Sequence, residues 1–132
     1  MSSLHSRDPR CRRYILLVDD EQDIIDVLRE YLEKNYEIVS ALEGATALDL
    51  VRARRPDLIL LDYAMPGING VDVLKAVKDI DATIPVIMIT AHPNNAVAAE
   101  VLRCGAFSYF PKPFDLRYLD HLTAAALSER PR

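Results

Sequence analysis

The sequence predicts an α/β fold in which a parallel sheet of five strands is covered by helices on both faces. Five short apolar runs alternate with five segments of helical periodicity, the connections between them are short, and no segment is repeated. Such alternation requires a doubly wound parallel sheet. The chain has 132 residues, half of them hydrophobic, which are the length and apolar content of one globular domain.

The first half of the chain is expected to supply three strands and two helices. Residues 14–18 are apolar throughout, which is typical of a strand buried on both faces. Further strands are predicted over 36–41 and 58–61, and a helix over 44–54 that ends before Pro56. Between the first two strands lies an amphipathic helix, whose inward residues at i, i+3, i+4, i+7 and i+8 are Ile24, Val27, Leu28, Tyr31 and Leu32.

The second half repeats the alternation after a turn-forming loop, MPGING. A helix is predicted over 71–80, a strand over 86–90, and a helix that Asn94 or Asn95 caps and that runs to Cys104. Gly105 is a suitable stop for that helix, and a strand follows over 108–110. The last helix is marked by Leu116, Leu119, Leu122, Ala126 and Leu127.

The two ends of the chain are expected to lie outside this domain. Residues 1–13 carry a local charge of +3, which leaves −7 on the remainder of a chain whose formal charge is −4. The basic segment is predicted to be a flexible arm, and residues 128–132 a tail or the start of a linker. The acidic remainder is unlike a nucleic-acid-binding surface, so no direct nucleic-acid contact is expected.

No membrane partner is expected either. The chain lacks an apolar run of membrane-spanning length and shows no signal peptide, so a cytoplasmic location is the expectation. Cys11 and Cys104 have no metal-binding spacing, and Cys104 is expected to be a small buried apolar residue.

Polar side chains stand where four of the predicted strands end. Asp19 and Asp20 follow the first strand, Asp62 follows the third, Thr90 ends the fourth, and Lys112 follows the fifth. In an open parallel sheet these carboxyl ends share one edge, and ligands bind there. Three carboxylates, a hydroxyl and an ammonium at one edge predict a cation site that contains a nucleophile.

The residue types suit phosphoryl transfer. Burial and neighbouring carboxylates would raise the pKa of Asp62, and a divalent cation, Mg²⁺ or Mn²⁺, held by Asp19 and Asp20 and shared by Asp62 would offset that effect. Asp62 could then attack phosphorus and form an acyl phosphate. Lys112 would neutralise charge and Thr90 would donate a hydrogen bond to the phosphoryl oxygens.

Each of these residues alone has a simpler explanation. The aspartate pair could cap a helix, Asp62 could start a turn, Thr90 could be a strand-end hydroxyl, and Lys112 could be a solvated lysine. It is their joint placement at one sheet edge that favours a site.

The chain resembles the receiver domain of two-component response regulators. The matching segments are VDDE at 18–21, LLDYAMPGING at 60–70, ITA at 89–91 and GAFSYFPKPF at 105–114. The resemblance covers about residues 14–127 and implies a flavodoxin-like receiver fold, with strand order 2-1-3-4-5 and five helices. It also implies a cis peptide bond between Lys112 and Pro113.

The resemblance assigns roles by position. Asp62 is implied as the phosphoacceptor, Asp19 and Asp20 as metal ligands together with the backbone carbonyl of Ala64, and Lys112 and Thr90 as the phosphoryl-binding pair. Tyr109 is implied as the switch aromatic that moves inward when Thr90 is drawn to the phosphoryl group. Two variable positions beside the site, Ala64 and His92, are expected to affect the lifetime of the phosphoryl group, with the direction open.

The implied function is a signalling switch. A histidine kinase or phosphotransfer protein would phosphorylate Asp62, and the surface of the fourth helix, fifth strand and last helix would change and signal to an output domain or protein. A homodimer through the fourth and last helices is plausible. No catalysis is expected beyond the chain's own phosphorylation and dephosphorylation.

Three other functions compete with this one. The first is a binding module of the same fold that does not depend on phosphorylation, and the complete residue set argues against it. The second is a phosphatase with an aspartyl nucleophile, which usually has a second aspartate where this chain has Ala64. The third is a flavin-binding protein, which needs a phosphate-cradling loop after its first strand, whereas the acidic loop VDDEQD would repel phosphate without a metal.

Overall fold

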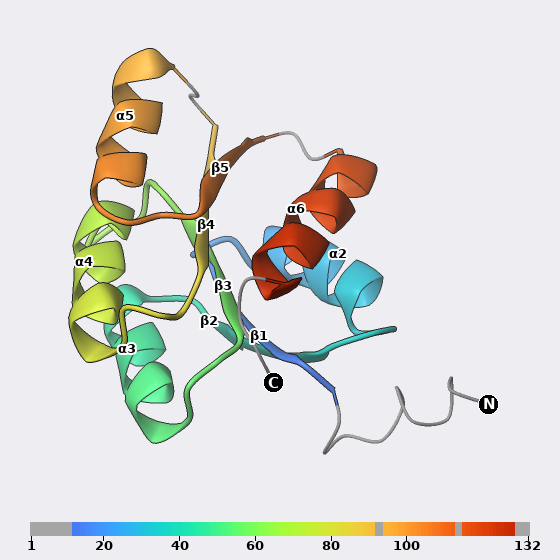
Figure 1. Ribbon diagram of the computed structural model, residues 1–132. Helices are drawn as coiled ribbons and strands as arrows, with labels where there is room; N and C mark the ends of the chain where they lie inside the picture. The colour runs from blue at the N-terminus through green and yellow to red at the C-terminus, as the bar shows by residue number, and fades with distance from the viewer. Residues whose placement is uncertain (1–11, 92–93, 113–114, 129–132) are drawn as a thin grey trace.

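The fold is a five-stranded parallel sheet between two layers of helices (Figure 1). It was analysed in a computed structural model that describes residues 12–91, 94–112 and 115–128. All four strand pairings are parallel, and the strand order is β2-β1-β3-β4-β5. The strands are β1 (Tyr14–Val18), β2 (Glu37–Ala41), β3 (Leu58–Asp62), β4 (Val86–Thr90) and β5 (Ser108–Pro111). The predicted fold class and strand order are confirmed.

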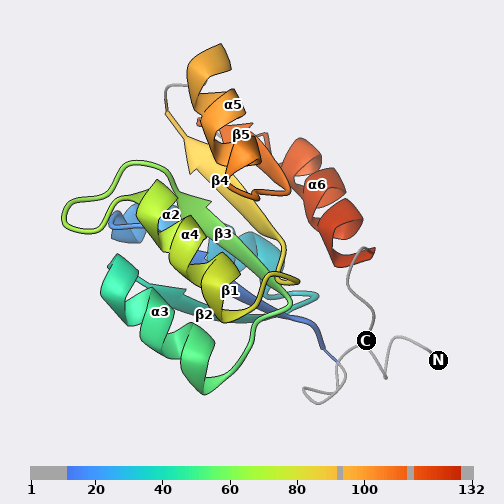
Figure 2. The same cartoon turned by 60° about the vertical axis from the view of Figure 1, so that its left-hand side comes forward.

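Five helices in the described part of the chain cover the two faces of the sheet. They are α2 (Gln22–Leu32), α3 (Gly44–Ala53), α4 (Gly70–Ile80), α5 (Asn95–Arg103) and α6 (Leu116–Ser128). Helices α2 and α6 lie on one face, and α3, α4 and α5 lie on the other (Figures 1 and 2). Among the described residues, no helix is both long enough and apolar enough to span a membrane.

The strands divide the core into two halves. Ile15 and Leu17 of β1 pack with α2 and α6, whereas Leu16 and Val18 pack with α3, α4 and α5. Successive strand residues point to opposite faces, so a strand that is apolar at every position can bury both sides. All five residues of β1, β3 and β4 are buried, which explains the continuous apolar runs in the sequence.

Most predicted boundaries hold to within one residue. Asn94 is the N-cap of α5, and its side chain accepts a hydrogen bond from the backbone N–H of Val97. Gly105 has a φ of +104°, a left-handed conformation that suits glycine after a helix. Cys104 caps the end of α5 and is half-buried, so the expectation of a buried residue was wrong.

The inward face of α2 differs from the prediction at Val27, whose side chain is 47% exposed. The buried stripe of this helix runs through Ile25, Leu28 and Leu32. Val27 lies about 100° around the helix from Leu28 and about 160° from Ile25, so it falls outside that stripe. The apolar spacing was compatible with two neighbouring faces, and packing against the sheet selected the one that contains Ile25.

The loop between β3 and α4 folds tightly back onto the end of β3. The N–H of Gly70 donates to the carbonyl of Tyr63 over 3.0 Å. A β-carbon at Gly70 would overlap the carbonyl oxygen of Asp62 and lie 2.8 Å from Cα and O of Tyr63. Asn69 caps α4 by accepting a hydrogen bond from the N–H of Asp72. The start of α4 is therefore packed directly against the backbone of Asp62.

Candidate functional site

The predicted site residues meet at the carboxyl edge of the sheet. Asp19 and Asp20 directly follow β1, Asp62 and Thr90 are the last residues of β3 and β4, and Lys112 directly follows β5. A cavity of about 310 Å³ lies at this edge. Its lining includes Asp20, Asp62, Ala64, Thr90 and Lys112. Strand ends that are far apart in sequence thus supply one polar cavity.

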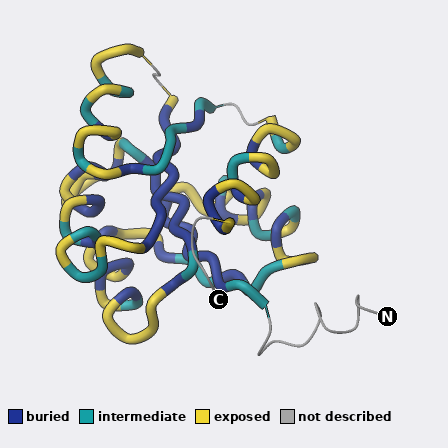
Figure 3. Tube along the Cα trace, in the orientation of Figure 1, coloured by how far each residue is buried: buried dark blue, intermediate teal, exposed yellow. Residues whose placement is uncertain are grey.

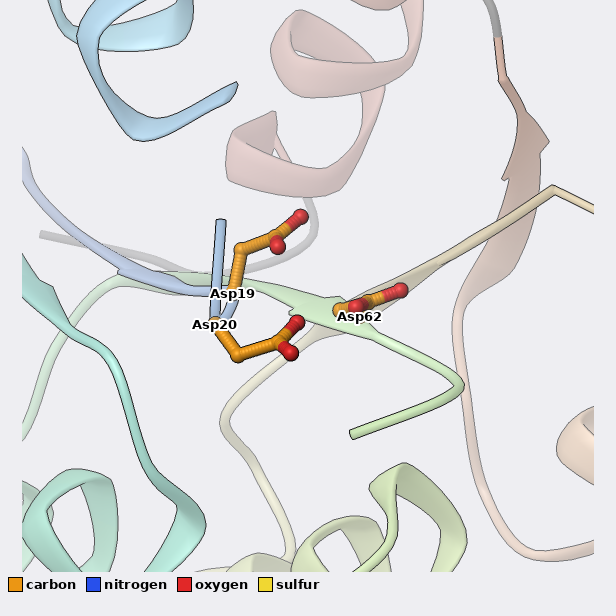
Figure 4. A group of neighbouring side chains, drawn as sticks. All are labelled: Asp19, Asp20 and Asp62. Carbon is orange, nitrogen blue, oxygen red and sulfur yellow. The ribbon is translucent and has the colours of Figure 1, made fainter. Parts of the chain in front are cut away.

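Three carboxylates form the acidic part of the site. Each of Asp19, Asp20 and Asp62 offers an oxygen, and these oxygens lie within 4.8 Å of one another. Figure 4 shows Asp19 and Asp20 leaving the end of β1 and Asp62 leaving the end of β3. Asp19 and Asp62 are only 2% and 4% exposed, whereas Asp20 is exposed. Two of the three carboxylates are therefore removed from water, where their charge needs a partner.

The two oxygens of Asp19 have different surroundings. Oδ1 accepts a hydrogen bond of 2.9 Å from the backbone N–H of Glu21, which helps to start α2. Oδ2 is buried and accepts no hydrogen bond from any described residue, although Nζ of Lys112 lies 3.3 Å away. Buried oxygens without a donor are uncommon. A hard cation at this position would satisfy Oδ2, so the donor set fits a divalent metal.

Lys112 places its ammonium among the carboxylates. Its Nζ lies 3.3 Å from Oδ2 of Asp19, 3.6 Å from Oδ1 of Asp62 and 3.2 Å from Oε1 of Glu21. The side chain is 15% exposed, so the alternative of a solvated lysine is wrong. The contact with Glu21 is a hydrogen bond that the sequence analysis did not predict.

The electrostatics of the site raise the pKa of Asp62 above its ordinary value. Burial and then the charge of Asp19 raise the pKa of Asp62 from 3.8 to about 6, against the opposing effects of Lys112 and the Ala64 backbone. Burial also raises the pKa of Asp19. Burial lowers the pKa of Lys112, but Asp62, Asp19 and Glu21 outweigh it, so the net direction is upward.

The remaining predicted residues occupy the surroundings of the cavity. Thr90 is 2% exposed, and its carbonyl accepts a hydrogen bond of 2.8 Å from the N–H of Lys112, which joins the ends of β4 and β5. Tyr109 is half-buried and packs against the part of the core beneath α3, α4 and α5. His92 and the bond between Lys112 and Pro113 lie outside the described residues.

Three further residues, which the sequence did not predict, also shape the site. Glu21 binds Lys112, and Gly70 closes the loop onto Asp62. Tyr63 follows Asp62 and donates its hydroxyl to Oε1 of Glu100 on α5 over 2.9 Å. All three lie inside the matching segments VDDE and LLDYAMPGING, but the sequence assigned no role to any of them.

Comparison with known proteins gives one consistent result. The sequence profile of the response regulator receiver domain matches residues 15–124. Sporulation initiation phosphotransferase F of Bacillus subtilis (strain 168) is 43% identical over 103 residues, which cover 77% of this chain and 83% of that protein. Transcriptional regulatory protein CpxR of Escherichia coli (strain K12) is 43% identical over 106 residues.

The matched relatives differ in length. The match to CpxR covers 80% of this chain but 45% of CpxR. Regulatory protein AtoC of Escherichia coli (strain K12) is 40% identical over 114 residues, which are 86% of this chain and 25% of AtoC. The chain thus spans less than half the length of these two relatives.

Solved structures agree with the fold. The receiver domain of the Francisella response regulator 1452 superposes with a TM-score of 0.84 at 26% identity, and the match covers 90% of this chain and 99% of that one. The Vibrio cholerae chemotaxis protein CheY4 has a TM-score of 0.84 at 28% identity and covers 88% of this chain and 99% of its own.

Proposed function

Because this chain belongs to the response regulator receiver domain family of two-component signalling, we propose that Asp62 accepts a phosphoryl group in a Mg²⁺-dependent reaction. One observation carries the proposal. Asp62 is a buried carboxyl with a pKa near 6, and it lies beside Lys112, Asp19 and Asp20 at a cavity on the sheet edge. A carboxylate in that setting lowers the stability of the fold, so a purely structural role does not explain it. It suits an acceptor that a cation and an ammonium can keep ionised.

Asp19, Asp20 and Asp62 would hold the metal, together with the backbone carbonyl of Ala64. Their carboxylate oxygens lie within 4.8 Å of one another, so the three side chains converge on one position. Mn²⁺, another oxygen-seeking divalent ion, could replace Mg²⁺. The bound ion would neutralise charge on the carboxylates and on the incoming phosphoryl oxygens.

The chain's own groups divide the rest of the chemistry. A carboxylate oxygen of Asp62 attacks phosphorus, the new P–O bond forms as the bond to the donor breaks, and the donor leaves with that electron pair. The Lys112 ammonium, which is already 3.6 Å from Asp62, then pairs with a phosphoryl oxygen. The hydroxyl of Thr90 donates a hydrogen bond to another oxygen.

The signalling part of the proposal concerns the surface formed by α5, β5 and α6. Movement of Thr90 toward the phosphoryl group would draw Tyr109 inward and change this surface. The phosphoryl donor would be a histidine kinase or a phosphotransfer protein, and the downstream partner would be an output domain or a separate protein. Two copies could pair through α5 and α6.

The proposed extent of the receiver domain is residues 14–127, with residues 1–13 as a basic arm and 128–132 as a tail. The proposed location is the cytoplasm. We propose no catalysis beyond the chain's own phosphorylation and dephosphorylation, and no direct contact with nucleic acid or membrane.

The experiment that tests acceptance is phosphorylation by a small donor. Incubation with Mg²⁺ and acetyl phosphate, followed by intact-protein mass spectrometry, should give one phosphoryl adduct that Asp62→Asn abolishes. The exposed aspartate Asp79 on α4 provides a matched control, because Asp79→Asn should leave the adduct in place. A folded wild-type protein that gives no adduct would instead support a binding module that does not depend on phosphorylation.

The lifetime of the phosphoryl group is expected to depend on Ala64 and His92. Ala64 is exposed at the rim of the cavity and has no side chain that could orient or block a water molecule. The test is the rate of loss of the adduct after the donor is removed. If the phosphoryl adducts of Ala64→Asn and His92→Ala are both lost at the wild-type rate, these positions do not control the lifetime of the phosphoryl group.

A further inference from the structure

Tyr63, the residue after Asp62, forms hydrogen bonds to three different elements. Its N–H donates to the carbonyl of Ile89 on β4 over 2.7 Å, and its carbonyl accepts from the N–H of Gly70 at the start of α4 over 3.0 Å. Its hydroxyl donates to Oε1 of Glu100 on α5 over 2.9 Å. The two backbone bonds hold the main chain of the residue in place, and the hydroxyl links it to α5.

Helix α5 is the described helix that the core holds most weakly. Val101 is its single buried residue, whereas α4 buries five residues. Figure 3 shows α5 as mostly exposed along its length. A helix with so little buried apolar surface opens and shifts at low cost, so a single hydrogen bond to a charged acceptor is a large share of what holds it.

The bond spans a groove and is not part of a packed layer. A groove of about 610 Å³ lies between the β3–α4 loop, α4 and α5, and its lining includes Tyr63, Met65, Lys75 and Glu100. Open space beside the bond lets the side chains of Tyr63 and Glu100 separate without a clash, and Val101 then remains as the buried contact of α5.

We propose that Tyr63 is a positioning residue whose hydroxyl, bound to Glu100, holds α5 beside the loop that follows Asp62 and so opposes movement of α5 when Asp62 is phosphorylated. The inference rests on the proposed phosphoacceptor function of Asp62. Tyr63 directly follows Asp62, so its bond to Glu100 ties α5 to the backbone that carries the proposed acceptor. Coupling between two sites is reciprocal, so a bond that opposes movement of α5 also opposes the phosphoryl binding that would drive this movement.

The first measurement is backbone amide hydrogen exchange of α5 in the unliganded protein. Tyr63→Phe removes only the hydroxyl and should speed exchange over residues 95–103 about fivefold, which corresponds to about 1 kcal/mol for one hydrogen bond. Exchange in α4 should not change and serves as the internal reference. Exchange that is unchanged in α5, or raised equally in every element, overturns the proposal.

The second measurement is the affinity for beryllofluoride, a phosphoryl analogue, in the presence of Mg²⁺, followed by fluorine NMR. Tyr63→Phe should bind it up to about fivefold more tightly, because the bond no longer has to break. Glu100→Ala should have the same effect, and the double variant should add nothing further. Glu100→Gln keeps an acceptor oxygen and should lie between Glu100→Ala and the wild type.

The matched control removes a phenolic hydroxyl elsewhere. Tyr118 on α6 is 46% exposed and its ring stacks on Phe110, and Tyr118→Phe should leave α5 exchange and beryllofluoride affinity unchanged. Unchanged or weaker binding in Tyr63→Phe overturns the proposal. If the wild-type protein does not bind beryllofluoride, the proposed acceptor function fails, and the exchange data alone decide whether Tyr63 holds α5.

Discussion

Replacing Asp62 with asparagine in the metal-free protein should stabilise the fold at neutral pH. The pKa of Asp62 is raised from 3.8 to about 6, first by burial and then by Asp19. An unfolded chain would therefore ionise this group more readily than the folded protein does. Asp62→Asn keeps the size of the side chain and removes its charge, so it removes this penalty.

The sign and the window follow from proton binding. Between about pH 3.8 and pH 6 the folded state of the wild-type protein holds a proton that the unfolded state has released, so this group makes stability fall as pH rises. Below that window the group contributes nothing, and above it the penalty is constant. The gap between the two pKa values corresponds to roughly 3 kcal/mol. The contact with Lys112 is already part of this gap, because it lowers the pKa of Asp62, so the expected gain for Asp62→Asn is roughly 3 kcal/mol.

The assay is urea unfolding at pH 4 and pH 7.5 in the presence of a chelator. The free energy of unfolding of Asp62→Asn should exceed that of the wild type by roughly 3 kcal/mol at pH 7.5 and match it within about 0.5 kcal/mol at pH 4. The exposed control Asp79→Asn should show no such change with pH. If the wild-type protein and Asp62→Asn have parallel pH profiles, folding does not raise the pKa of Asp62 and the reasoning is refuted.

Three further outcomes are expected. Addition of Mg²⁺ at a hundredfold excess over its Kd should raise the free energy of unfolding by about 2.7 kcal/mol, and Asp19→Asn should abolish most of this gain. Lys112→Met should raise the pKa of Asp62 further because an opposing charge 3.6 Å away is lost; carbon-13 NMR titration would show it, and an unchanged or lower pKa would contradict it. Gly70→Ala should cost roughly 2 kcal/mol or more in urea unfolding because its β-carbon meets the backbone of Asp62. Gly67→Ala, with a φ of +79° and open space around it, should cost only about 1 kcal/mol, and equal costs would reject the packing argument.

The sequence by itself determined the fold class and the acidic edge of the sheet. Short continuous apolar runs rich in β-formers are typical of strands that are buried on both faces, and β1, β3 and β4 are such strands. Since parallel strands end at one edge, the residues after the runs had to meet there. That geometry placed Asp19, Asp62 and Lys112 together without any knowledge of distances.

Tertiary structure alone decided how the site is balanced and what surrounds it. The raised pKa of Asp62, the binding of Lys112 by Glu21 and the bond from Tyr63 to Glu100 all depend on distances between segments far apart in the chain. The exposure of Val27 has the same origin, because packing against the sheet chooses between two faces that the apolar spacing leaves equivalent. Periodicity and strand ends are local signals, whereas charge balance and contacts between elements exist only after the chain has folded.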